Sequence, residues 1–507
     1  MRPGRVRGAV IGIAAALFAL GMAELVAGLS ASLRSPMVDI GDRVIDLVPS
    51  GIKELAIDLL GTADKPALLV GILLVLLGYA ALVGLIAVRS SLTAGIVAIG
   101  LLGLVGAAAS AIGPLGLYGA LPSLIGAVGG MVVLVVLSSS ASMATDDDPH
   151  FGASRRSFIV ASGAVAASAV VLGGAGKALD RRFDAEGARS GLRLPAPTTP
   201  LAPMPPGAGF DSVTGITPFT TPNDSFYRID TALTVPQVAI DGYELSITGL
   251  VDRPLQIGYR NLLERPLIES DITITCVSNE VGGKLAGNAR WLGVRLDDLL
   301  EEAGVQSGAD QIVGRSVDRY TCGFPTSVLD GRDAMVAVGM NGEPLPVNHG
   351  FPARLIVPGL YGYVSATKWL AEIRLTTFAE FDHYWVGRGW SPRAPIKTQS
   401  RIDTPGPLDR IPAGPTVVAG VAWAQTRGIE QVEVRVDDGE WQSAELAAEL
   451  NDTTWRQWKL AWDATPGRHD LACRATDGRG VLQTETRAEP IPDGATGWHT
   501  IVVLVEE

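Results

Sequence analysis

Three cysteines occur in the chain, and one of them is placed for chemistry. Cys276 ends the strand-like run 271–275, in which Ile and Thr alternate, and opens the polar, glycine-containing loop 277–283. A thiol that a rigid sheet presents at the mouth of a strand can bind a metal or attack a substrate. A disulfide to Cys322 and an inert thiol are the alternatives. Cys473 lies in an alternating strand pattern, and we interpret it as a small core residue.

Other kinds of site do not fit this composition. Three cysteines cannot all pair, so no disulfide framework is expected. The chain has no Cys-x-x-Cys motif and only five histidines, which argues against a tetrahedral zinc site. Its 41 Lys and Arg residues against 53 Asp and Glu residues give a net charge of −12, which disfavours nucleic-acid binding.

The region around Cys276 has an α+β pattern that we assign to residues 210–398. Short apolar strands, such as 243–247 and 272–276, are separated by polar turns. A helix is predicted at 296–303.

Residues 399–507 have a purely β pattern. Alternating valines precede an Asp-Gly hairpin turn, and other short strands follow, each bounded by turn residues. Strands at this spacing indicate an immunoglobulin-like sandwich. The predicted strands lie at 432–436, 455–462, 469–475 and 499–505.

Four short motifs follow one another in the α+β region. They are Thr275-Cys-Val-Ser-Asn-Glu280, Gly287-Asn-Ala-Arg-Trp-Leu-Gly-Val-Arg295, Met340-Asn-Gly-Glu-Pro-Leu-Pro-Val-Asn-His-Gly-Phe-Pro-Ala-Arg-Leu-Ile-Val-Pro-Gly359 and Lys368-Trp-Leu370. Together they resemble the sulfite oxidase family of molybdopterin-dependent oxidoreductases, here as a membrane-anchored bacterial member. The resemblance spans roughly 216–506 and implies a C-terminal sandwich that can mediate a homodimer.

The resemblance implies a molybdenum site with one pyranopterin. Cys276 matches the catalytic thiolate that bonds the metal, and a soft sulfur ligand suits such a metal. His349, Arg354, Thr367 and Lys368 match the group that holds the pterin and its phosphate.

Two further residues enter through the same resemblance. Tyr227 and Arg228 match a cofactor-contacting segment, whose arginine also faces the metal pocket and is a catalytic candidate. Taken singly and without the resemblance, Arg354 would be a surface charge, His349 a loop histidine and Lys368 a solvated lysine.

The substrate pocket departs from the family pattern. Glu280 and Val281 stand where the animal and plant enzymes carry two arginines, and Gly387 stands at the tyrosine position. A late arginine has no counterpart in 490–497. A pocket short of positive charge binds a doubly charged anion poorly, so sulfite is not the expected substrate, although Arg388 could replace one charge.

The implied reaction is oxygen-atom transfer on a small sulfur compound, S-oxide or N-oxide. No His-Pro-Gly-Gly segment and no cysteine cluster occurs, so neither haem nor an iron–sulfur cluster is expected. An external electron carrier is therefore implied, either a cytochrome or a quinone-linked protein. The alternative is a metal-free, anchored binding or scaffold protein that retains the fold.

Residues 1–178 are predicted to form an all-α transmembrane bundle. Two long runs contain no charged residue, whereas a transmembrane helix needs only about 20 apolar residues. The longer run is interrupted at Gly113-Pro114, which predicts a tight turn between two spans. The five predicted spans lie at 8–30, 66–88, 158–176 and, on either side of that turn, within 90–145.

Two observations bear on what this bundle does. Glu24 lies near the end of the first span, and we interpret it as reaching the interface, with a functional carboxylate as the alternative. Residues 1–149 contain no histidine, so the bundle cannot hold a haem by two imidazoles. An anchor or an assembly surface is therefore expected.

The arrangement across the membrane follows from charge. Arginines near the span ends give a weak positive-inside signal, which with five spans places everything after Lys177 outside the cytoplasm. Residues 154–159 resemble a twin-arginine export signal inside the chain, although two arginines flanking a helix are the alternative. We expect a multi-pass protein of the cell membrane, in contact with lipid, whose catalytic domain is extracytoplasmic. Residues 179–209 form a predicted proline-rich linker.

Overall fold

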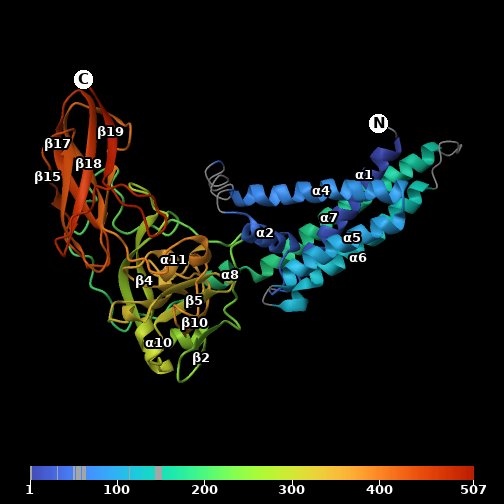
Figure 1. The fold of residues 1–507 in the computed structure, drawn as a ribbon, viewed down its shortest axis with the longest axis horizontal. Coiled ribbons are helices and arrows are strands. Elements are labelled where there is room, and N and C mark those ends of the chain that lie inside the picture. Colours follow the sequence, from blue (N-terminus) through green and yellow to red (C-terminus); the bar gives the residue numbers. More distant parts are fainter. Residues whose placement is uncertain are drawn as a thin grey trace. The chain divides into compact units, whose positions relative to one another are not determined.

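A computed structural model describes residues 3–30, 32–49, 52, 59, 64–112, 115–142 and 151–507. The chain divides into two compact units, one made of Met1–Asp184 with Ala232–Gln237 and the other of Ala185–Thr231 with Val238–Glu507 (Figure 1). The predicted turn at Gly113-Pro114 lies outside the described residues. The division at residues 178, 209 and 398 stays a prediction.

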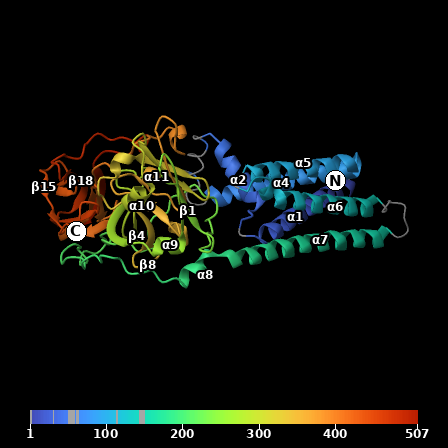
Figure 2. The same cartoon turned by 90° about the horizontal axis from the view of Figure 1, so that it is seen from below.

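The regular elements that the structure describes in the first unit are all helices (Figure 2). Its elements are α1 (Pro3–Ala27), α2 (Pro36–Leu47), α4 (Asp64–Arg89), α5 (Leu92–Ala111), η2 (Gly116–Ala120), α6 (Leu121–Ser142), α7 (Phe151–Asp180) and η3 (Arg181–Phe183). Helix α1 packs against α4, α6 and α7.

Among the residues that the structure describes, five helical segments are long and apolar enough to cross a membrane, in agreement with the predicted number. They are Arg5–Ala27, Lys65–Arg89, Leu92–Ala111, Gly116–Ser139 and Arg156–Ser190. Helix α7 is longer than the predicted span 158–176, because it begins at Phe151 and continues to Asp180. The twin-arginine-like residues 154–159 therefore lie inside the first turns of this helix.

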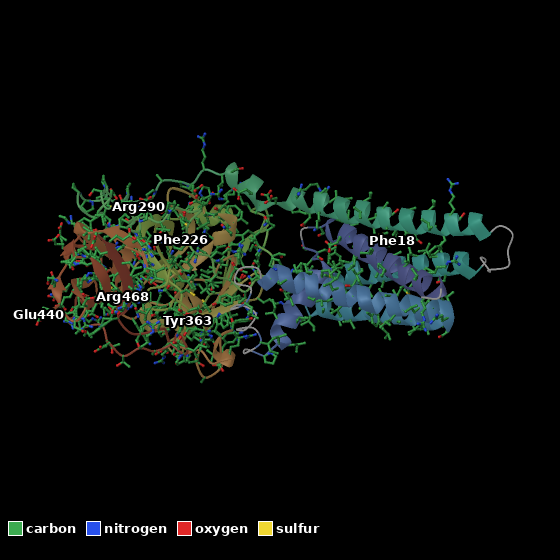
Figure 3. The ribbon with its side chains drawn as sticks, turned by 90° about the horizontal axis from the view of Figure 1, so that it is seen from above. Phe18, Phe226, Arg290, Tyr363, Glu440 and Arg468 are labelled. Atoms are coloured by element: carbon green, nitrogen blue, oxygen red, sulfur yellow. The ribbon has the colours of Figure 1, made fainter. Side chains whose placement is uncertain are left out.

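Small residues allow the helices of the first unit to approach closely. A Cβ atom added to Gly12 would lie only 1.8 Å from the carbonyl oxygen of Ala80 in α4. One added to Gly21 would lie 2.4 Å from the carbonyl oxygen of Ala169 in α7. Close backbone approach through small residues is a common way for helices to associate in a membrane, where water cannot drive association. Phe18, which is labelled in Figure 3, is partly buried and packs against the buried hydrophobic residues of this unit.

Glu24, near the end of α1, accepts a hydrogen bond from Ser35. The hydroxyl of Ser35 donates to a carboxylate oxygen of Glu24, and the same hydroxyl accepts from the backbone N–H of Met37 at the start of α2. The carboxylate is thus used locally, near the junction of two helices.

Residues 232–237 belong to the helical unit although they lie far away in sequence. The ammonium of Lys65 donates to the carbonyl oxygen of Ala232 at 2.6 Å. The side chain of Leu233 lies against Gly41 of α2, where an added Cβ would come within 2.7 Å of it.

The second unit begins with an α+β region. Two sheets form it, with strand orders β2-β1-β10-β5-β6 and β3-β4-β7-β8, and β9 pairs with β7. Its helices are α8 (Ala185–Ser190), α9 (Tyr259–Leu263), α10 (Leu296–Ala303), η4 (Thr326–Val328), η5 (Val347–His349), α11 (Gly362–Ser365) and η6 (Val386–Arg388). Its strands are β1 (Glu244–Gly249), β2 (Leu255–Gly258), β3 (Leu267–Thr275), β4 (Ala286–Arg295), β5 (Gln311–Ser316), β6 (Thr321–Pro325), β7 (Met335–Met340), β8 (Glu343–Pro344), β9 (Arg354–Ile356) and β10 (Leu370–Thr376).

Helix α10 has the predicted bounds. Leu296, Leu299, Leu300 and Ala303 recur at helical spacing and are buried, and Gly304 ends the helix in a left-handed conformation. The shorter helices α9 and α11 were not predicted, because four or five residues are too few to show a helical period.

The C-terminal region contains two sheets, with strand orders β11-β13-β17-β16 and β12-β19-β18-β14-β15. Buried residues from both sheets share one hydrophobic core. That the sandwich is of the immunoglobulin type stays a prediction. Its strands are β11 (Gln399–Thr404), β12 (Arg410–Pro412), β13 (Gly414–Trp423), β14 (Ile429–Val436), β15 (Gln442–Ser443), β16 (Glu445–Leu446), β17 (Arg456–Ala464), β18 (Gly467–Asp477) and β19 (His499–Glu506).

The proline-rich stretch 195–206 contains no helix, as expected from its composition. Thr198 nevertheless donates its backbone N–H to the carbonyl oxygen of Leu267 at 2.8 Å, and Thr199 forms an isolated bridge with Ile268 beside β3. Helical turns at 181–183 and 185–190, which composition did not predict, precede this stretch. Much of the predicted linker therefore packs on the second unit.

Candidate cofactor site

Cys276 is the first residue after strand β3, as the sequence pattern predicted. Its backbone N–H donates to the carbonyl oxygen of Leu285 at 2.9 Å, and its own carbonyl oxygen accepts from the N–H of Asn279 at 3.1 Å. The side chain of Asn279 closes the loop by accepting from the N–H of Leu285 at 2.7 Å. The thiol is buried and free, which excludes the disulfide to Cys322.

Burial controls the ionisation of this thiol. It raises the pKa of Cys276, and hydrogen bonds from Ser278 and the positive charge of Lys368 oppose the rise. A thiol of this kind keeps its proton until a cation replaces it.

Loops that connect the C-terminal strands hold the strand that carries Cys276. One edge of β3 pairs with β4. At the other edge, Thr273 donates its backbone N–H to the carbonyl oxygen of Thr453 at 3.0 Å, and the Thr273 hydroxyl accepts from the N–H of Trp455 at 2.8 Å. The side-chain amide of Gln425 donates to the carbonyl oxygen of Thr273 at 3.2 Å.

Residues of the C-terminal sheets hold the loop that follows Cys276. Arg401 donates to the carbonyl oxygen of Gly283 at 2.8 Å, and its guanidinium pairs with Asp403 at 2.6 Å. The ring of His499 packs against Gly282, where an added Cβ would lie 2.2 Å from the ring. Gly282 also has a φ of +79°, so glycine is required there for two reasons.

Two cationic side chains pair with one carboxylate, and a third cation lies near one of them. Arg228 pairs with Asp230 through Nε and Oδ2 at 2.7 Å, and the ammonium of Lys368 lies 3.2 Å from the same oxygen. Burial lowers the pKa of Lys368 to about 8, although the carboxylate of Asp230 acts in the opposite direction. The third cation is Arg354, which is also buried, and burial lowers its pKa to about 10.

Arg354 is held from two sides. Its guanidinium donates to the carbonyl oxygen of His349 at 3.0 Å and lies over the ring of Trp291, 5.0 Å from the centroid. Its Nε has no hydrogen-bond partner among the described residues. One donor of a buried arginine is thus left for a ligand.

His349 is a buried, neutral imidazole. Burial, followed by the charges of Arg354 and Lys368, lowers the pKa of His349 to about 3. Its Nε2 lies 3.1 Å from the carbonyl oxygen of Asn223 and therefore carries the proton. Nδ1 is then an acceptor, and it has no partner within the described parts of the chain. The ring of Phe226 meets the imidazole edge to face at 5.6 Å, within the packed interior seen in Figure 3.

A glycine lets the His349–Arg354 loop approach Lys368. Gly350 has a φ of +112°, and a Cβ there would lie 3.0 Å from Cα of Lys368. The next residue, Trp369, donates from its indole N–H to the carbonyl oxygen of Val347 at 2.8 Å. These contacts join the two motifs into one site.

Tyr227 belongs to the same cluster, whereas the side chain of Thr367 does not. Burial raises the pKa of Tyr227 well above 10, with a further rise from the charge of Cys276 and an opposing effect of Arg354. The hydroxyl of Thr367 instead lies 2.9 Å from the sulfur of Cys322. Thr367 therefore contributes to the core beneath Lys368.

An aromatic cluster adjoins the end of β3. Helix α11 lies there, and a Cβ on its first residue, Gly362, would be 3.7 Å from the carbonyl oxygen of Thr275. Tyr320 donates its hydroxyl to the carbonyl oxygen of Tyr363 in this helix at 2.6 Å. The rings of Tyr320 and Tyr384 are 5.6 Å apart, and the guanidinium of Arg388 stacks on Tyr384 at 3.7 Å.

Sequence reasoning missed three residues of this site. Asp230 pairs with two of the cations, Asn223 orients His349, and Trp291 supports Arg354. Trp291 lies within one of the four motifs, and Asp230 lies two residues after Arg228. Both signals were available, whereas the contact of Asn223 depends on the fold.

The residues present fit an anionic pterin cofactor. Three cations against one carboxylate leave positive charge for a phosphate. Nδ1 of His349 and Nε of Arg354 are an acceptor and a donor without partners in the described structure, as expected where a polar ligand binds. The free thiol of Cys276 can serve as one metal ligand.

Comparisons with known proteins agree with this geometry. A family model described as the oxidoreductase molybdopterin binding domain matches residues 232–385, which include Cys276, His349, Arg354 and Lys368. Human mitochondrial sulfite oxidase is 29% identical over 341 residues, an alignment that covers 57% of this chain and 62% of the human one. The uncharacterized oxidoreductase YuiH of Bacillus subtilis is 33% identical over 151 residues, which cover 30% of this chain and 73% of YuiH.

The chain belongs to the sulfite oxidase family of molybdopterin-binding oxidoreductases. A solved structure of the sulfane dehydrogenase SoxCD from Paracoccus pantotrophus matches with a TM-score of 0.50 and 24% identity, covering 57% of this chain and 84% of that one. At this identity the likeness concerns the fold alone. The chain spans somewhat less than two thirds of the length of the mitochondrial sulfite oxidases that it matches.

Proposed function

We propose that the chain is a membrane-anchored molybdopterin-dependent oxidoreductase that transfers an oxygen atom to or from a small substrate. The observation that carries this proposal is the free, buried thiol of Cys276 in one unit with the cationic cluster around Asp230. The fold and the family membership support the same reading.

Five residues are proposed to hold the cofactor. Cys276 would bind the metal, and Arg228, Arg354 and Lys368 would bind the phosphate of the pterin. Nδ1 of His349 would accept a hydrogen bond from a pterin N–H group, because its other nitrogen already carries the proton. Bound molybdenum would supply the two-electron oxygen-atom transfer, and the side chains orient substrate and cofactor.

The substrate is proposed to be a sulfur compound, an S-oxide or an N-oxide rather than sulfite. Glu280 is exposed on the loop after Cys276, and Gly387 has no side chain to offer. Arg388 stacks on Tyr384 and donates to its carbonyl oxygen at 2.7 Å, so its charge is placed among aromatic rings. Such surroundings favour a substrate of low charge over a dianion.

The setting of the enzyme follows from the helices. We propose a multi-pass protein of the cell membrane whose second unit is extracytoplasmic and exchanges electrons with a cytochrome or a quinone-linked protein. The C-terminal sandwich, which we expect to be immunoglobulin-like, is proposed to mediate a homodimer. Cross-linking or light scattering of the detergent-solubilised chain would test the dimer.

Metal analysis tests the central proposal. We expect about one molybdenum per chain in the native protein and none after Cys276→Ser. Cys473→Ser is the matched control, because Cys473 is also a buried free thiol but lies in the core of the C-terminal sheets. Loss of metal in the control as well, or metal retained without Cys276, would contradict the assignment.

A substrate panel tests the reaction. Sulfite, methionine sulfoxide, trimethylamine N-oxide and nitrate would each be assayed with an artificial electron dye. We expect turnover of an S-oxide or N-oxide and weak or absent turnover of sulfite. Efficient sulfite oxidation would refute the proposed substrate class but not the cofactor.

A second candidate function is an anchored binding or scaffold protein without metal. The replacement of the pocket arginines by Glu280 and Val281 favours it. The unpartnered buried atoms of His349 and Arg354 argue against it, because a protein without ligand gains nothing by keeping them. Preparations that never contain molybdenum would support the scaffold.

A further inference from the structure

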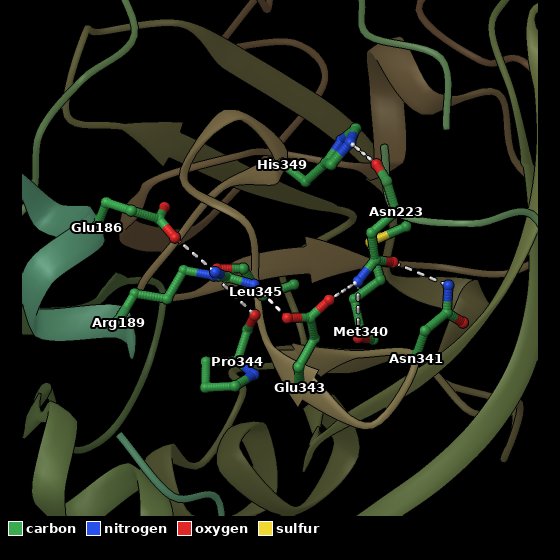
Figure 4. A network of polar contacts seen from close by, with 9 residues as sticks. All are labelled: Glu186, Arg189, Asn223, Met340, Asn341, Glu343, Pro344, Leu345 and His349. Atoms are coloured by element: carbon green, nitrogen blue, oxygen red, sulfur yellow. Dashed lines mark hydrogen bonds and ion pairs between the residues drawn. The ribbon is translucent and has the colours of Figure 1, made fainter. Parts of the chain in front are cut away.

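A series of polar contacts connects α8 to His349 (Figure 4). It starts at Arg189, whose side chain is 13% exposed. Nε of Arg189 donates to the carbonyl oxygens of Pro344 at 3.1 Å and Leu345 at 3.0 Å, and a terminal nitrogen pairs with Glu343 at 2.6 Å. A guanidinium has enough donors in one plane to hold both a main chain and a carboxylate. Arg189 thus fixes strand β8 and the residue after it.

Glu343, which pairs with Arg189, also binds Asn223. Its second carboxylate oxygen accepts from the side-chain amide of Asn223 at 2.7 Å. The same amide nitrogen donates to the carbonyl oxygen of Met340 at 3.3 Å, and the amide oxygen accepts from Asn341 at 2.8 Å. All of the Asn223 side chain is therefore held by the turn between β7 and β8.

Asn223 in turn acts on the candidate cofactor site through its main chain. Its carbonyl oxygen accepts from Nε2 of His349, which sets the tautomer and the plane of the imidazole. Asn223 also begins the segment that contains Tyr227 and Arg228. Displacing Asn223 would turn the imidazole and shift that segment together.

We propose that Arg189 is a positioning residue of the cofactor site. A turn that composition assigned to a linker thereby becomes part of the catalytic unit. The family model matches residues 232–385, and Arg189 lies outside them. The contacts of Arg189 therefore support the site from outside the matched region. The positioning role rests on the contacts described above. It rests on the proposed function only for the identity of the ligand, a molybdenum-bound pterin.

Hydrogen exchange of the full-length protein in detergent tests the proposal without any need for bound cofactor. In Arg189→Gln we expect backbone amides of 223–231 to exchange about three to ten times faster, as loss of a partly buried ion pair permits. Arg265→Gln is the matched control, because Arg265 pairs with Glu302 at 2.5 Å in the same unit. Faster exchange confined to 185–190 in Arg189→Gln would overturn the proposal.

A rescue separates positioning from simple loosening of α8. Arg189→Lys keeps the charge opposite Glu343 but has no planar fork, so exchange of 223–231 should be intermediate between the native protein and Arg189→Gln. Molybdenum content should follow the same order, with Arg265→Gln equal to the native protein. If none of the variants holds metal while exchange follows the order, the proposed function fails and the positioning role stands. Equal exchange of 223–231 in all variants would refute the positioning role.

Discussion

Three buried histidines of the second unit have a lowered pKa and are therefore uncharged. His383 is 1% exposed, and the ring of Tyr363 lies edge to face with it at 5.8 Å. Burial lowers the pKa of His383 to about 4, and the same cause acts on His349 and His499. Each of these imidazoles is therefore neutral in the folded protein at neutral pH.

Replacement of His383 by Phe should make the second unit less sensitive to acid. The pKa of His383 is near 6.5 in the unfolded chain and about 4 in the folded chain. Between these two pH values the unfolded chain binds the proton more readily. The free energy of unfolding therefore has its full value above pH 6.5 and decreases as the pH falls toward 4. At pH 5 this loss is about 2 kcal/mol, and His383→Phe should remove it. Denaturant unfolding at pH 8 and pH 5, followed by tryptophan fluorescence, measures the difference.

Tryptophan fluorescence reports on the correct unit, because all ten tryptophans lie at or after Trp291. An unchanged difference between pH 8 and pH 5 in His383→Phe would contradict the prediction. His469 is the contrasting residue, since the carboxylate of Asp437 raises its pKa and its replacement should have the opposite dependence on pH.

The resemblance to the sulfite oxidase family, carried by four motifs, allowed Cys276, His349, Arg354 and Lys368 to be predicted as one site. The structure brings these residues together through a glycine turn and two loops. The partners that orient them could not be predicted as readily. An asparagine such as Asn223 has no pattern of its own, because its role depends on contacts with residues more than a hundred positions away.

Among the elements, strand β3 is the one whose support was least expected. Its pattern predicted a buried strand that ends at Cys276, and the structure agrees. The residues that bond its second edge come from loops of the C-terminal region, and no local pattern contains so distant a contact. Sequence reasoning thus identified the strand but not what holds it.

The buried pair of Arg401 and Asp403 should be important to this support. Both side chains are 6% exposed, and the guanidinium also reaches Gly283 and Thr217. Arg401→Met leaves a buried carboxylate without its cation and should cost about 3–5 kcal/mol of unfolding free energy. The double variant Arg401→Met/Asp403→Leu should recover most of this loss.

Arg410→Gln is the control for that experiment. Arg410 pairs with Glu506 in the same region, but the two side chains are 70% and 56% exposed, so the change should alter stability by less than about 1 kcal/mol. Equal effects of the buried and exposed variants in denaturant unfolding would count against the role assigned to Arg401.

The contact between α1 and α4 gives a prediction for the helical unit. Gly12→Leu would force the two backbones apart and should cost at least about 2 kcal/mol. Gly78→Leu is the control, because Gly78 of α4 is exposed and a side chain there meets open space. Titration with dodecyl sulfate, followed by circular dichroism, compares the two, and an equal loss of helix would show that α1 does not pack as described.

At the scale of the whole molecule, the number of membrane-length helices was predictable because apolar length is a local property. The allocation of residues to the two units was less predictable. Residues 232–237 belong with the helices, where the carbonyl oxygen of Ala232 accepts from Lys65. A short neutral segment carries no sign of such a distant partner.

The proposal that the second unit is extracytoplasmic can be tested directly. If residues 154–159 direct export, replacing Arg155 and Arg156 by lysine should leave the chain in the membrane with its second unit inside the cell. Protease added to intact cells should digest the second unit of the native protein and not that of the variant. Unchanged digestion would argue that the two arginines only flank α7.

The dependence of β3 on the C-terminal region has a consequence for biogenesis. Cys276 is synthesised before residues 401–499. Until those residues have been added, strand β3 lacks the hydrogen bonds at its second edge, and the loop after Cys276 lacks its contact with Arg401. We therefore expect metal insertion to be a late, post-translational event. Chains arrested before residue 499 should be unable to retain the metal, however long they wait in its presence.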